Sequence, residues 1–285
     1  MEALRVSYSS DLSSDSDDSP RASENTNCAQ RPMSNPMEPI NLPPPPSDLL
    51  QPQNSLDFTT FKGNRIRSFP HVQGNYALHI FIPVRIPFIN RKQIASAIKT
   101  MSSLVPDLYV VDVDIGLNDL CKDNEQFEQL ILEREFHISL GRPVPINVHQ
   151  IDSIVTMLRQ RLQFQRRYWM EFNKWDVFVN DELTRSFLSL EVTGNGLLEI
   201  TRQISIVDDI YRLHGLPKFY KNPRPHISVV WALGDVSNLL KPGAEELNKF
   251  RNNAGPSGRH IFTCNFSGIE CRIGKKLYTI LKFAD

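Results

Sequence analysis

The sequence predicts an α+β fold of two related lobes within residues 61–285. Along this stretch, segments with the apolar period of a strand alternate with segments that have the period of a helix. The two halves also share one local order, in which a helix precedes a strand that carries a His-x-Ser motif. These observations indicate two similar lobes, although the halves share too little sequence to prove duplication.

Residues 1–60 do not follow this pattern. They are rich in Ser, Asp, Asn and Pro, with a proline run at 43–46. Such a composition buries too little apolar surface to offset the entropy lost on ordering. We therefore expect a disordered tail that ends in a stiff, proline-rich linker. It serves either solubility and localisation alone, or docking and phosphorylation.

The individual elements follow from periodicity and end signals. Strands are expected at 76–82, 109–113, 135–140, 175–179, 186–192 and 226–231, with closing strands near Phe262 and Tyr278. Helices are expected to begin at Asn90, at Asn147 and at about Asn195. The first two asparagines each have a glutamine three residues later, which is the pattern of a capping box. The charged stretch 118–134 has no assigned role.

Composition limits the classes of function. The formal net charge is zero and the pI is about 7.1, which argues against binding to nucleic acid through bulk positive charge. Binding of a few nucleotides at the end of an RNA chain remains compatible with a net charge of zero. None of the four cysteines forms a C-x-x-C pair, so a structural zinc site is not expected. No apolar run has the length of a membrane helix, and we expect a soluble, intracellular protein.

Two short β-rich segments carry the residues suited to chemistry. FHISL contains His137 and Ser139, and PHISVVW contains His226 and Ser228. Residues i and i+2 of a strand point to the same face, so each motif presents one imidazole beside one hydroxyl. A single His-x-Ser motif is usually structural. Two copies at the spacing of a lobe favour a shared site if the lobes pack together.

Such a site suits transfer at an RNA phosphodiester. One neutral imidazole can take the proton of a ribose 2′-hydroxyl while the other, protonated, donates to the departing 5′-oxygen. The two hydroxyls can donate to the non-bridging phosphate oxygens as charge builds there. This chemistry needs no metal and no cofactor.

At these residues the chain resembles the two-histidine phosphoesterase superfamily and, within it, the U6 snRNA phosphodiesterase family. The narrower likeness is carried by 63–83, 184–192, 219–235 and 271–280, including the FPH…GN and FY-x-x-P-x-x-H-x-S patterns, and covers about 61–285. It implies two antiparallel lobes related by a pseudo-twofold axis, with helices outside and a central cleft. It also implies a 3′–5′ exonuclease that removes uridines or adenosines from the 3′ end of U6 snRNA.

The resemblance further implies a nuclear protein of RNA processing and mRNA splicing that works without a metal. The product would end in a 2′,3′-cyclic phosphate or a 3′-phosphate. We expect a monomer whose partner is the RNA 3′ end. By the same resemblance, His137 and His226 are the catalytic residues, Ser139 and Ser228 bind phosphate, and Tyr220 stacks on the terminal base.

Four further residues are candidates for nucleotide binding, each with a structural alternative. Asn222, Arg224 and Pro225 belong to an NPRP loop that the prolines should hold extended. The loop either lines the nucleotide pocket, with Arg224 on a phosphate, or carries a solvated arginine. Asp181 either contacts a uridine or simply ends a turn. His79, which alternates with apolar neighbours, is expected to be structural.

Two other functions are compatible with the same motifs. One is a cyclic phosphodiesterase that opens 2′,3′-cyclic phosphates at RNA ends without trimming. The other is a non-catalytic nucleotide-binding module, which the presence of both histidines makes less favoured.

Overall fold

The computed structural model describes residues 72–111, 115–123, 127, 129, 134–252 and 260–283. They belong to the second of the two units into which the chain divides, Phe58–Asp285. The predicted tail at 1–60 lies outside the described residues, as does the end of the strand predicted at 109–113. Most of the charged stretch 118–134 also lies outside them.

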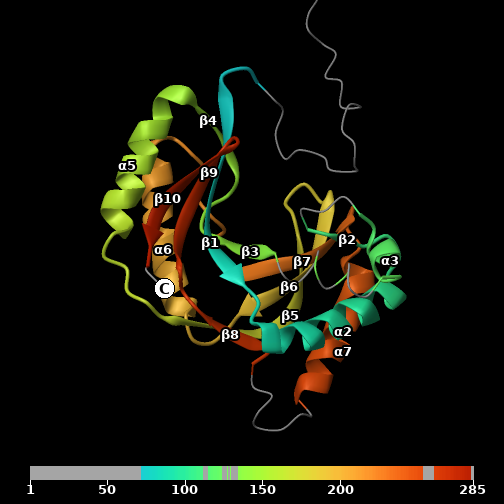
Figure 1. The fold of residues 1–285 in the computed structure, drawn as a ribbon. Helices are drawn as coiled ribbons and strands as arrows, with labels where there is room; N and C mark the ends of the chain where they lie inside the picture. Colours follow the sequence, from blue (N-terminus) through green and yellow to red (C-terminus); the bar gives the residue numbers. More distant parts are fainter. Residues whose placement is uncertain are drawn as a thin grey trace, which may run out of the picture. The chain divides into compact units, whose positions relative to one another are not determined.

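The described residues form an antiparallel sheet with helices around it (Figure 1). The strands are β1 (Asn75–Arg85), β2 (Tyr109–Val110), β3 (Glu135–Ser139), β4 (Val144–Asn147), β5 (Trp169–Val179), β6 (Arg185–Val192), β7 (His226–Leu233), β8 (Phe262–Asn265), β9 (Gly268–Ile273) and β10 (Lys276–Lys282). The helices are α2 (Phe88–Leu104), α3 (Leu117–Leu120), the 3₁₀ turn η1 (Val148–Gln150), α5 (Ile151–Leu162), α6 (Leu197–Leu213) and α7 (Ser237–Asn252). The predicted α+β class is confirmed.

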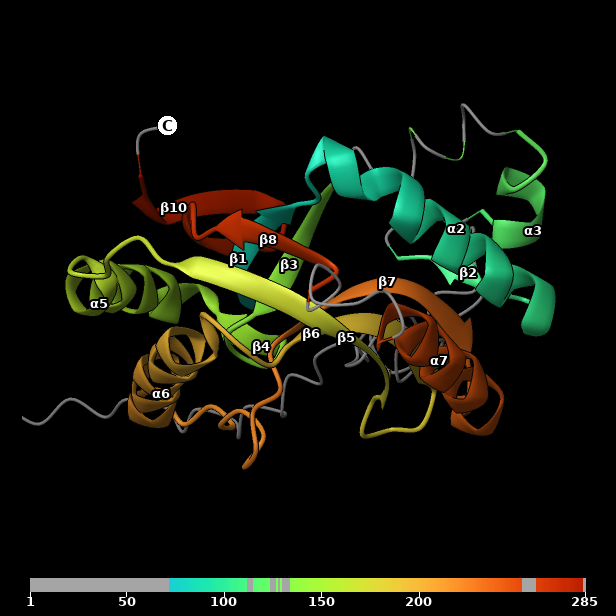
Figure 2. The ribbon, with the colours of Figure 1, turned by 90° about the horizontal axis from the view of Figure 1, so that it is seen from below.

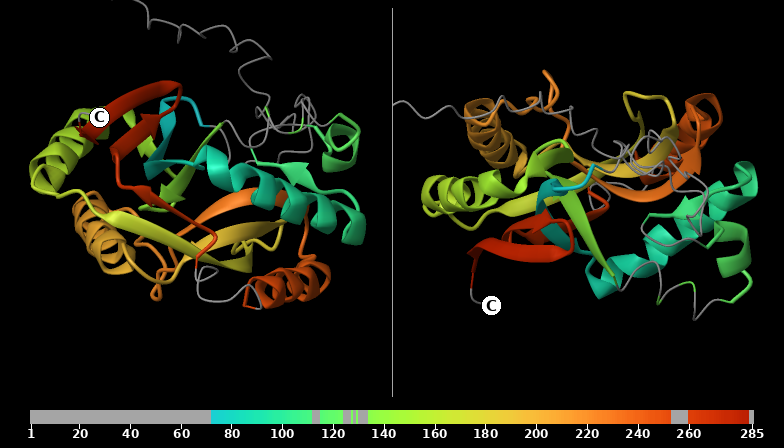
Figure 3. Two further views of the ribbon diagram at one scale, coloured as in Figure 1. Left: turned by 60° about the horizontal axis from the view of Figure 1, so that its bottom comes forward. Right: turned by 90° about the horizontal axis from the view of Figure 1, so that it is seen from above.

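The sheet is arranged symmetrically about two central strands. Its order is β10-β9-β1-β3-β7-β6-β5-β8, with β4 beside β1 and β2 beside β7. The two His-x-Ser strands, β3 and β7, are therefore direct neighbours with three further strands on either side. Figure 3 shows the red strands of one half and the orange and yellow strands of the other from two directions. The two predicted lobes are halves of one continuous sheet rather than separate sheets.

The helices divide between the two halves. α5 packs on β10 and on α6, whereas α7 packs on β5 and on α2. Figure 2 shows α5 and α6 beside one half of the sheet, and α2 and α7 beside the other. One cluster of buried apolar side chains runs through both halves and includes Ile138 of β3 and Ile227 of β7. Each such side chain contributes about 1.5–3 kcal/mol on burial, so the core holds the two central strands together.

Two helix starts were predicted from a capping box, and one of them differs in the structure. At Asn147 the predicted capping box is present, because its backbone N–H donates to Gln150 Oε1 at 2.9 Å. At Asn90 the prediction is wrong: α2 begins at Phe88 after Pro87, and Asn90 Nδ2 donates instead to the carbonyl of Ile261 at 2.9 Å. A proline before the first turn sets the start of this helix.

The segment after β3 is fixed by close contact with α6. A Cβ on Gly141 would lie 2.8 Å from the hydroxyl oxygen of Tyr211, a fully buried residue of α6. That hydroxyl donates to the carbonyl of Arg142 at 3.1 Å. Glycine at 141 therefore allows α6 to approach the end of the first motif strand.

We predict that Gly141→Ala lowers the free energy of unfolding by about 1–3 kcal/mol, because the buried Tyr211 ring must move. Urea unfolding followed by circular dichroism measures the change. Gly116→Ala is the matched control: its backbone φ is −63° and a Cβ there meets Asp119 at 3.9 Å, an ordinary contact. Equal stability of the two variants would show that the Gly141 contact is not tight.

Candidate active site

The pairing of β3 with β7 sets the geometry of the motif residues. The registered pair is Ile138 with Ile227, the middle residues of the two His-x-Ser motifs. Both isoleucines are fully buried. Because side chains alternate along a strand, the residues flanking each isoleucine point to the opposite face of the sheet.

Antiparallel register then determines which residues lie opposite one another. His137 lies across from Ser228, and Ser139 lies across from His226. Residues opposite each other on an antiparallel pair have Cβ atoms about 4.5–5.5 Å apart. The four motif side chains, all partly exposed, therefore form a compact quartet on one face of the sheet.

The neighbouring strand β1 places an additional imidazole against the quartet. His79 Nε2 lies 3.0 Å from Ser139 Oγ. The ring of His79 meets that of His137 edge to face, with centroids 4.9 Å apart. Phe81, two residues further along β1, contacts His137 at 5.6 Å between centroids. β1 thus places two rings against the histidine of the first motif.

On the other side, β6 supplies a buried hydroxyl. Ser189 is fully buried and is registered opposite Ser228. The two hydroxyl oxygens are 3.2 Å apart. Each motif serine therefore has a polar partner from the strand next to its own.

The orientation of His226 is fixed from two directions. Its Nδ1 lies 2.7 Å from the carbonyl oxygen of Arg224, and since a carbonyl only accepts, Nδ1 carries the hydrogen. The imidazole stacks on Phe178 of β5, with centroids 3.7 Å apart and planes 17° from parallel. In the neutral ring this leaves Nε2 with a free lone pair, which can accept a proton.

Two imidazoles of the site resist protonation. Desolvation lowers the pKa of His226 to about 4, even though Arg224 O and Glu191 favour the charged form. Desolvation, with the charges of His137 and Arg272, lowers the pKa of His79 to about 3. Both rings are therefore neutral at pH 7.

Arg224 is paired with two carboxylates. Its Nε and Nη2 donate to Glu191 at 2.7 and 2.6 Å, and Nη2 also pairs with Asp176. Its guanidinium lies 4.6 Å from the centre of the Phe178 ring. The side chain is 42% exposed, and its contact with a phosphate stays a prediction. The bidentate pair with Glu191 anchors the residue whose carbonyl orients His226.

The other candidate nucleotide-binding residues fall into two groups. Arg142 joins Tyr220 and Asp181: its guanidinium carbon lies 4.1 Å from the Tyr220 ring centre and its Nη1 donates to Asp181 at 2.7 Å. Desolvation, with Asp181 nearby, raises the pKa of Tyr220. Pro225 is buried, with its carbonyl accepting from Val192 N at 2.8 Å, and Asn222 is exposed.

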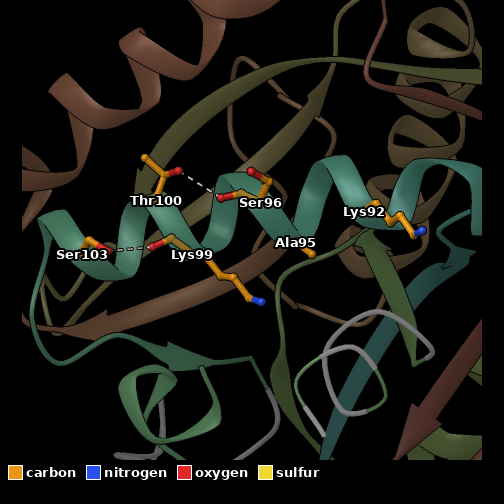
Figure 4. A pocket seen from close by; sticks show the side chains of 6 residues that line it. All are labelled: Lys92, Ala95, Ser96, Lys99, Thr100 and Ser103. Carbon is orange, nitrogen blue, oxygen red and sulfur yellow. Dashed lines mark hydrogen bonds between the residues drawn. The ribbon is translucent and has the colours of Figure 1, made fainter. Parts of the chain in front are cut away.

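A hollow elsewhere on the surface does not include the quartet. It runs along α2 and is lined by Lys92, Ala95, Ser96, Lys99, Thr100 and Ser103 (Figure 4). Among the described residues, no group of three or more His, Cys, Asp and Glu side chains is placed to hold a metal ion. The helices in the described ranges include none with the length and apolar character to cross a membrane.

Sequence reasoning missed the partners of the motif residues. His79, Ser189, Phe178 and Glu191 lie far from the motifs along the chain, whereas Arg142, three residues after Ser139, was not singled out. The one available signal was the alternation of His79 with apolar residues on β1, which places it on the face opposite the core. Strand register, which decides what it touches, cannot be read from that alternation.

Two histidines and two serines gather on one face of an antiparallel sheet, which is the arrangement that paired His-x-Ser motifs predict for a two-histidine phosphoesterase. The chain belongs to the HVSL family, described as an uncharacterised conserved protein, whose model matches residues 42–281. The family resemblance predicted from the sequence is thereby confirmed, since the curated relatives carry the name U6 snRNA phosphodiesterase 1.

The mouse relative of that name is 28% identical over 251 residues, covering 86% of this chain and 85% of its own length. The human one is 26% identical over 226 residues, covering 79% and 76%. Among solved structures, Kluyveromyces marxianus Usb1 with uridine monophosphate matches with a TM-score of 0.48 and 13% identity, over 72% of this chain and 97% of that one. Escherichia coli LigT complexed with 3′-AMP matches with a TM-score of 0.41 and 10% identity, over 72% and 95%.

We predict that Arg224→Gln lowers the free energy of unfolding by about 2 kcal/mol, because it leaves the carboxylate of Glu191 buried without its main partner. The side chain of Glu191 is 8% exposed. Arg212→Gln is the control, since its pair with Asp209 is exposed on both sides and should contribute less than about 0.5 kcal/mol. Similar small losses in both variants would show that the Arg224 pair does not stabilise the fold.

The lowered pKa of His226 predicts a pH dependence of stability. Between pH 6.5 and 4 the unfolded state takes up a proton at this imidazole that the folded state excludes, so stability falls as the pH falls through this window. We expect the free energy of unfolding of the wild type to fall more steeply over that range than that of His226→Gln. Parallel curves from urea titrations at several pH values would contradict the low pKa.

Proposed function

We propose that the chain is a metal-independent 3′–5′ RNA exonuclease that trims the 3′ oligouridine or adenosine end of U6 snRNA. The observation that carries the proposal is the register of β3 against β7, which gathers His137, Ser139, His226 and Ser228 on one sheet face. The names of the curated relatives support RNA, and U6 snRNA in particular, as the substrate.

His226 fits the role of general base. Its Nε2 is unprotonated at neutral pH and its ring is fixed by Arg224 O and Phe178. In this proposal Nε2 takes the proton of the ribose 2′-hydroxyl as the 2′-oxygen attacks the adjacent phosphorus. Each acid–base residue of this kind contributes about 10²–10⁴-fold to the rate.

His137 then acts as the general acid. In its protonated form it donates to the 5′-oxygen as the bond between phosphorus and that oxygen breaks. Ser139 and Ser228 donate to the non-bridging oxygens, where negative charge grows in the transition state. The shortened RNA keeps the phosphate as a 2′,3′-cyclic phosphate, and the terminal residue of a 3′-hydroxyl end leaves as a nucleoside with a 5′-hydroxyl. Attack by water on the ring, with the histidine roles reversed, would give a 3′-phosphate.

The terminal base is proposed to stack on Tyr220, which is 44% exposed. Stacking of a base on an aromatic ring is worth about 1–3 kcal/mol and tolerates several bases, which suits an enzyme that meets both uridine and adenosine. In the same proposal Asp181, which is linked to this ring through Arg142, contacts the base, and Asn222 and Pro225 line the nucleotide pocket. Arg224 orients His226 through its carbonyl, and contact of its guanidinium with a phosphate stays a prediction.

The cellular setting follows from this activity. We propose a nuclear protein that acts as a monomer on the RNA 3′ end, with residues 61–285 as the catalytic domain and 1–60 as a disordered tail. It works without metal or cofactor.

We predict that His137→Ala and His226→Ala each lower trimming of a 5′-labelled, oligouridine-tailed RNA by at least about 100-fold, in the presence of EDTA. The double variant should be little worse than either single one, because the two residues act in one step. His149→Ala, which changes an exposed histidine of η1, should trim at the wild-type rate.

Two outcomes would contradict the proposal. Trimming by either motif variant at the wild-type rate would exclude the acid–base assignment. Opening of a 2′,3′-cyclic phosphate without any shortening of the RNA would instead favour the cyclic phosphodiesterase.

A further inference from the structure

His79 occupies a position that the proposed mechanism leaves unexplained. It lies on β1 with its Nε2 3.0 Å from Ser139 Oγ, and its ring touches that of His137 at 4.9 Å between centroids. A buried histidine needs a hydrogen-bonding partner even where its role is only structural. Here the partner is one of the two serines of the quartet.

The direction of this hydrogen bond matters for the chemistry. A serine hydroxyl has one hydrogen to donate and two lone pairs with which to accept. If Ser139 donates to His79, its only hydrogen points away from the position of a bound phosphate. If His79 donates instead, Ser139 keeps its hydrogen for a non-bridging phosphate oxygen.

We propose that His79 is a positioning residue that donates a hydrogen bond from Nε2 to Ser139 Oγ, so that the serine hydroxyl is aimed at the scissile phosphate. The inference rests on the proposed function, because it assigns the direction of a contact within that site. His79 itself does not touch the reacting atoms.

Neutral histidine suits this position better than a charged donor. Desolvation, His137 and Arg272 lower the pKa of His79 to about 3, so the ring donates without adding a charge beside His137. Arg272 already lies opposite His79, and a second cation in place of His79 would further disfavour the protonated His137 that the proposed mechanism requires. The imidazole therefore orients the serine while leaving the acid free to hold its proton.

The second half of the sheet offers a parallel arrangement. Ser189, fully buried on β6, lies 3.2 Å from Ser228 Oγ, just as His79 on β1 lies beside Ser139. β1 and β6 are the strands next to β3 and β7, so each motif serine meets a polar side chain of the adjoining strand. The register differs, because Ser189 lies directly opposite Ser228 whereas Ser139 lies opposite Phe81 and meets His79 diagonally. If Ser189 is the donor of this hydrogen bond, Ser228 likewise keeps its own hydrogen for a non-bridging phosphate oxygen.

A pair of variants of similar length separates donation from packing. His79→Gln keeps an N–H donor near the place of Nε2, whereas His79→Met fills the space without one. We expect His79→Met to lower kcat for oligouridine trimming about tenfold or more with KM nearly unchanged, since loss of a whole transition-state donor costs about 10²–10³-fold. His79→Gln should stay within about threefold of the wild type.

A double-mutant cycle with Ser139→Ala tests whether His79 acts through the serine. In the Ser139→Ala background, His79→Met should cost less than about twofold, measured with long incubations. The same cost in both backgrounds would assign His79 to packing and overturn the inference. So would wild-type activity of His79→Met, or equal losses in the Gln and Met variants.

The tautomer can be measured without activity. Imidazole ¹⁵N chemical shifts of the folded wild-type chain, alone and with inorganic phosphate, distinguish protonated from unprotonated nitrogens. We expect the hydrogen of His79 on Nε2; a hydrogen on Nδ1, with Nε2 accepting, would overturn the inference even if His79→Met failed to fold. Absence of RNA trimming by the wild type would contradict the proposed function alone and leave the tautomer result standing.

Discussion

The antiparallel pairing of β3 with β7 is the constraint on which the site depends. A single registered pair, Ile138 with Ile227, joins two halves of the sheet that are otherwise built from their own strands and helices. Because the side-chain period of a strand is two residues, a shift of this register by one position would turn every motif residue of one strand toward the core. Burial of both isoleucines opposes that shift, so apolar packing on one face fixes the geometry of the quartet on the other.

Electrostatics then distinguish residues that share similar chemistry. His226 and His79 are both neutral imidazoles, but their nitrogens have different partners. In His226 a carbonyl fixes the hydrogen on Nδ1 and leaves the lone pair of Nε2 available. In His79 it is Nε2 that contacts a hydroxyl. Arg224, which could have served as a phosphate ligand, is paired with Glu191 and Asp176. The charge for the proposed reaction therefore rests on protonated His137, and the non-bridging oxygens meet neutral hydroxyl donors. A site of this kind agrees with a chain whose formal net charge is zero.

The sequence was sufficient to predict most of the local structure and the motif strands, but not the contacts across strands. The capping box at Asn147 and the strands carrying His137 and His226 are coded within a few neighbouring residues, and they were predicted correctly. β9 was missed although Ile269, Cys271 and Ile273 alternate with polar residues along it. The contacts of His79 and Ser189 depend on the pairing of β1 with β3 and of β6 with β7, and apolar alternation alone does not specify pairing.

The central claim is that one phosphate is held by the four side chains that β3 and β7 present together. A crystal structure with an oligouridine whose scissile ribose carries 2′-fluorine, and therefore cannot cyclise, tests it most directly. The account predicts the last internucleotide phosphate within hydrogen-bonding distance of Ser139 Oγ and Ser228 Oγ, with the imidazoles of His137 and His226 on either side. A phosphate bound elsewhere, for example at the lysines of α2, with the quartet empty would contradict it.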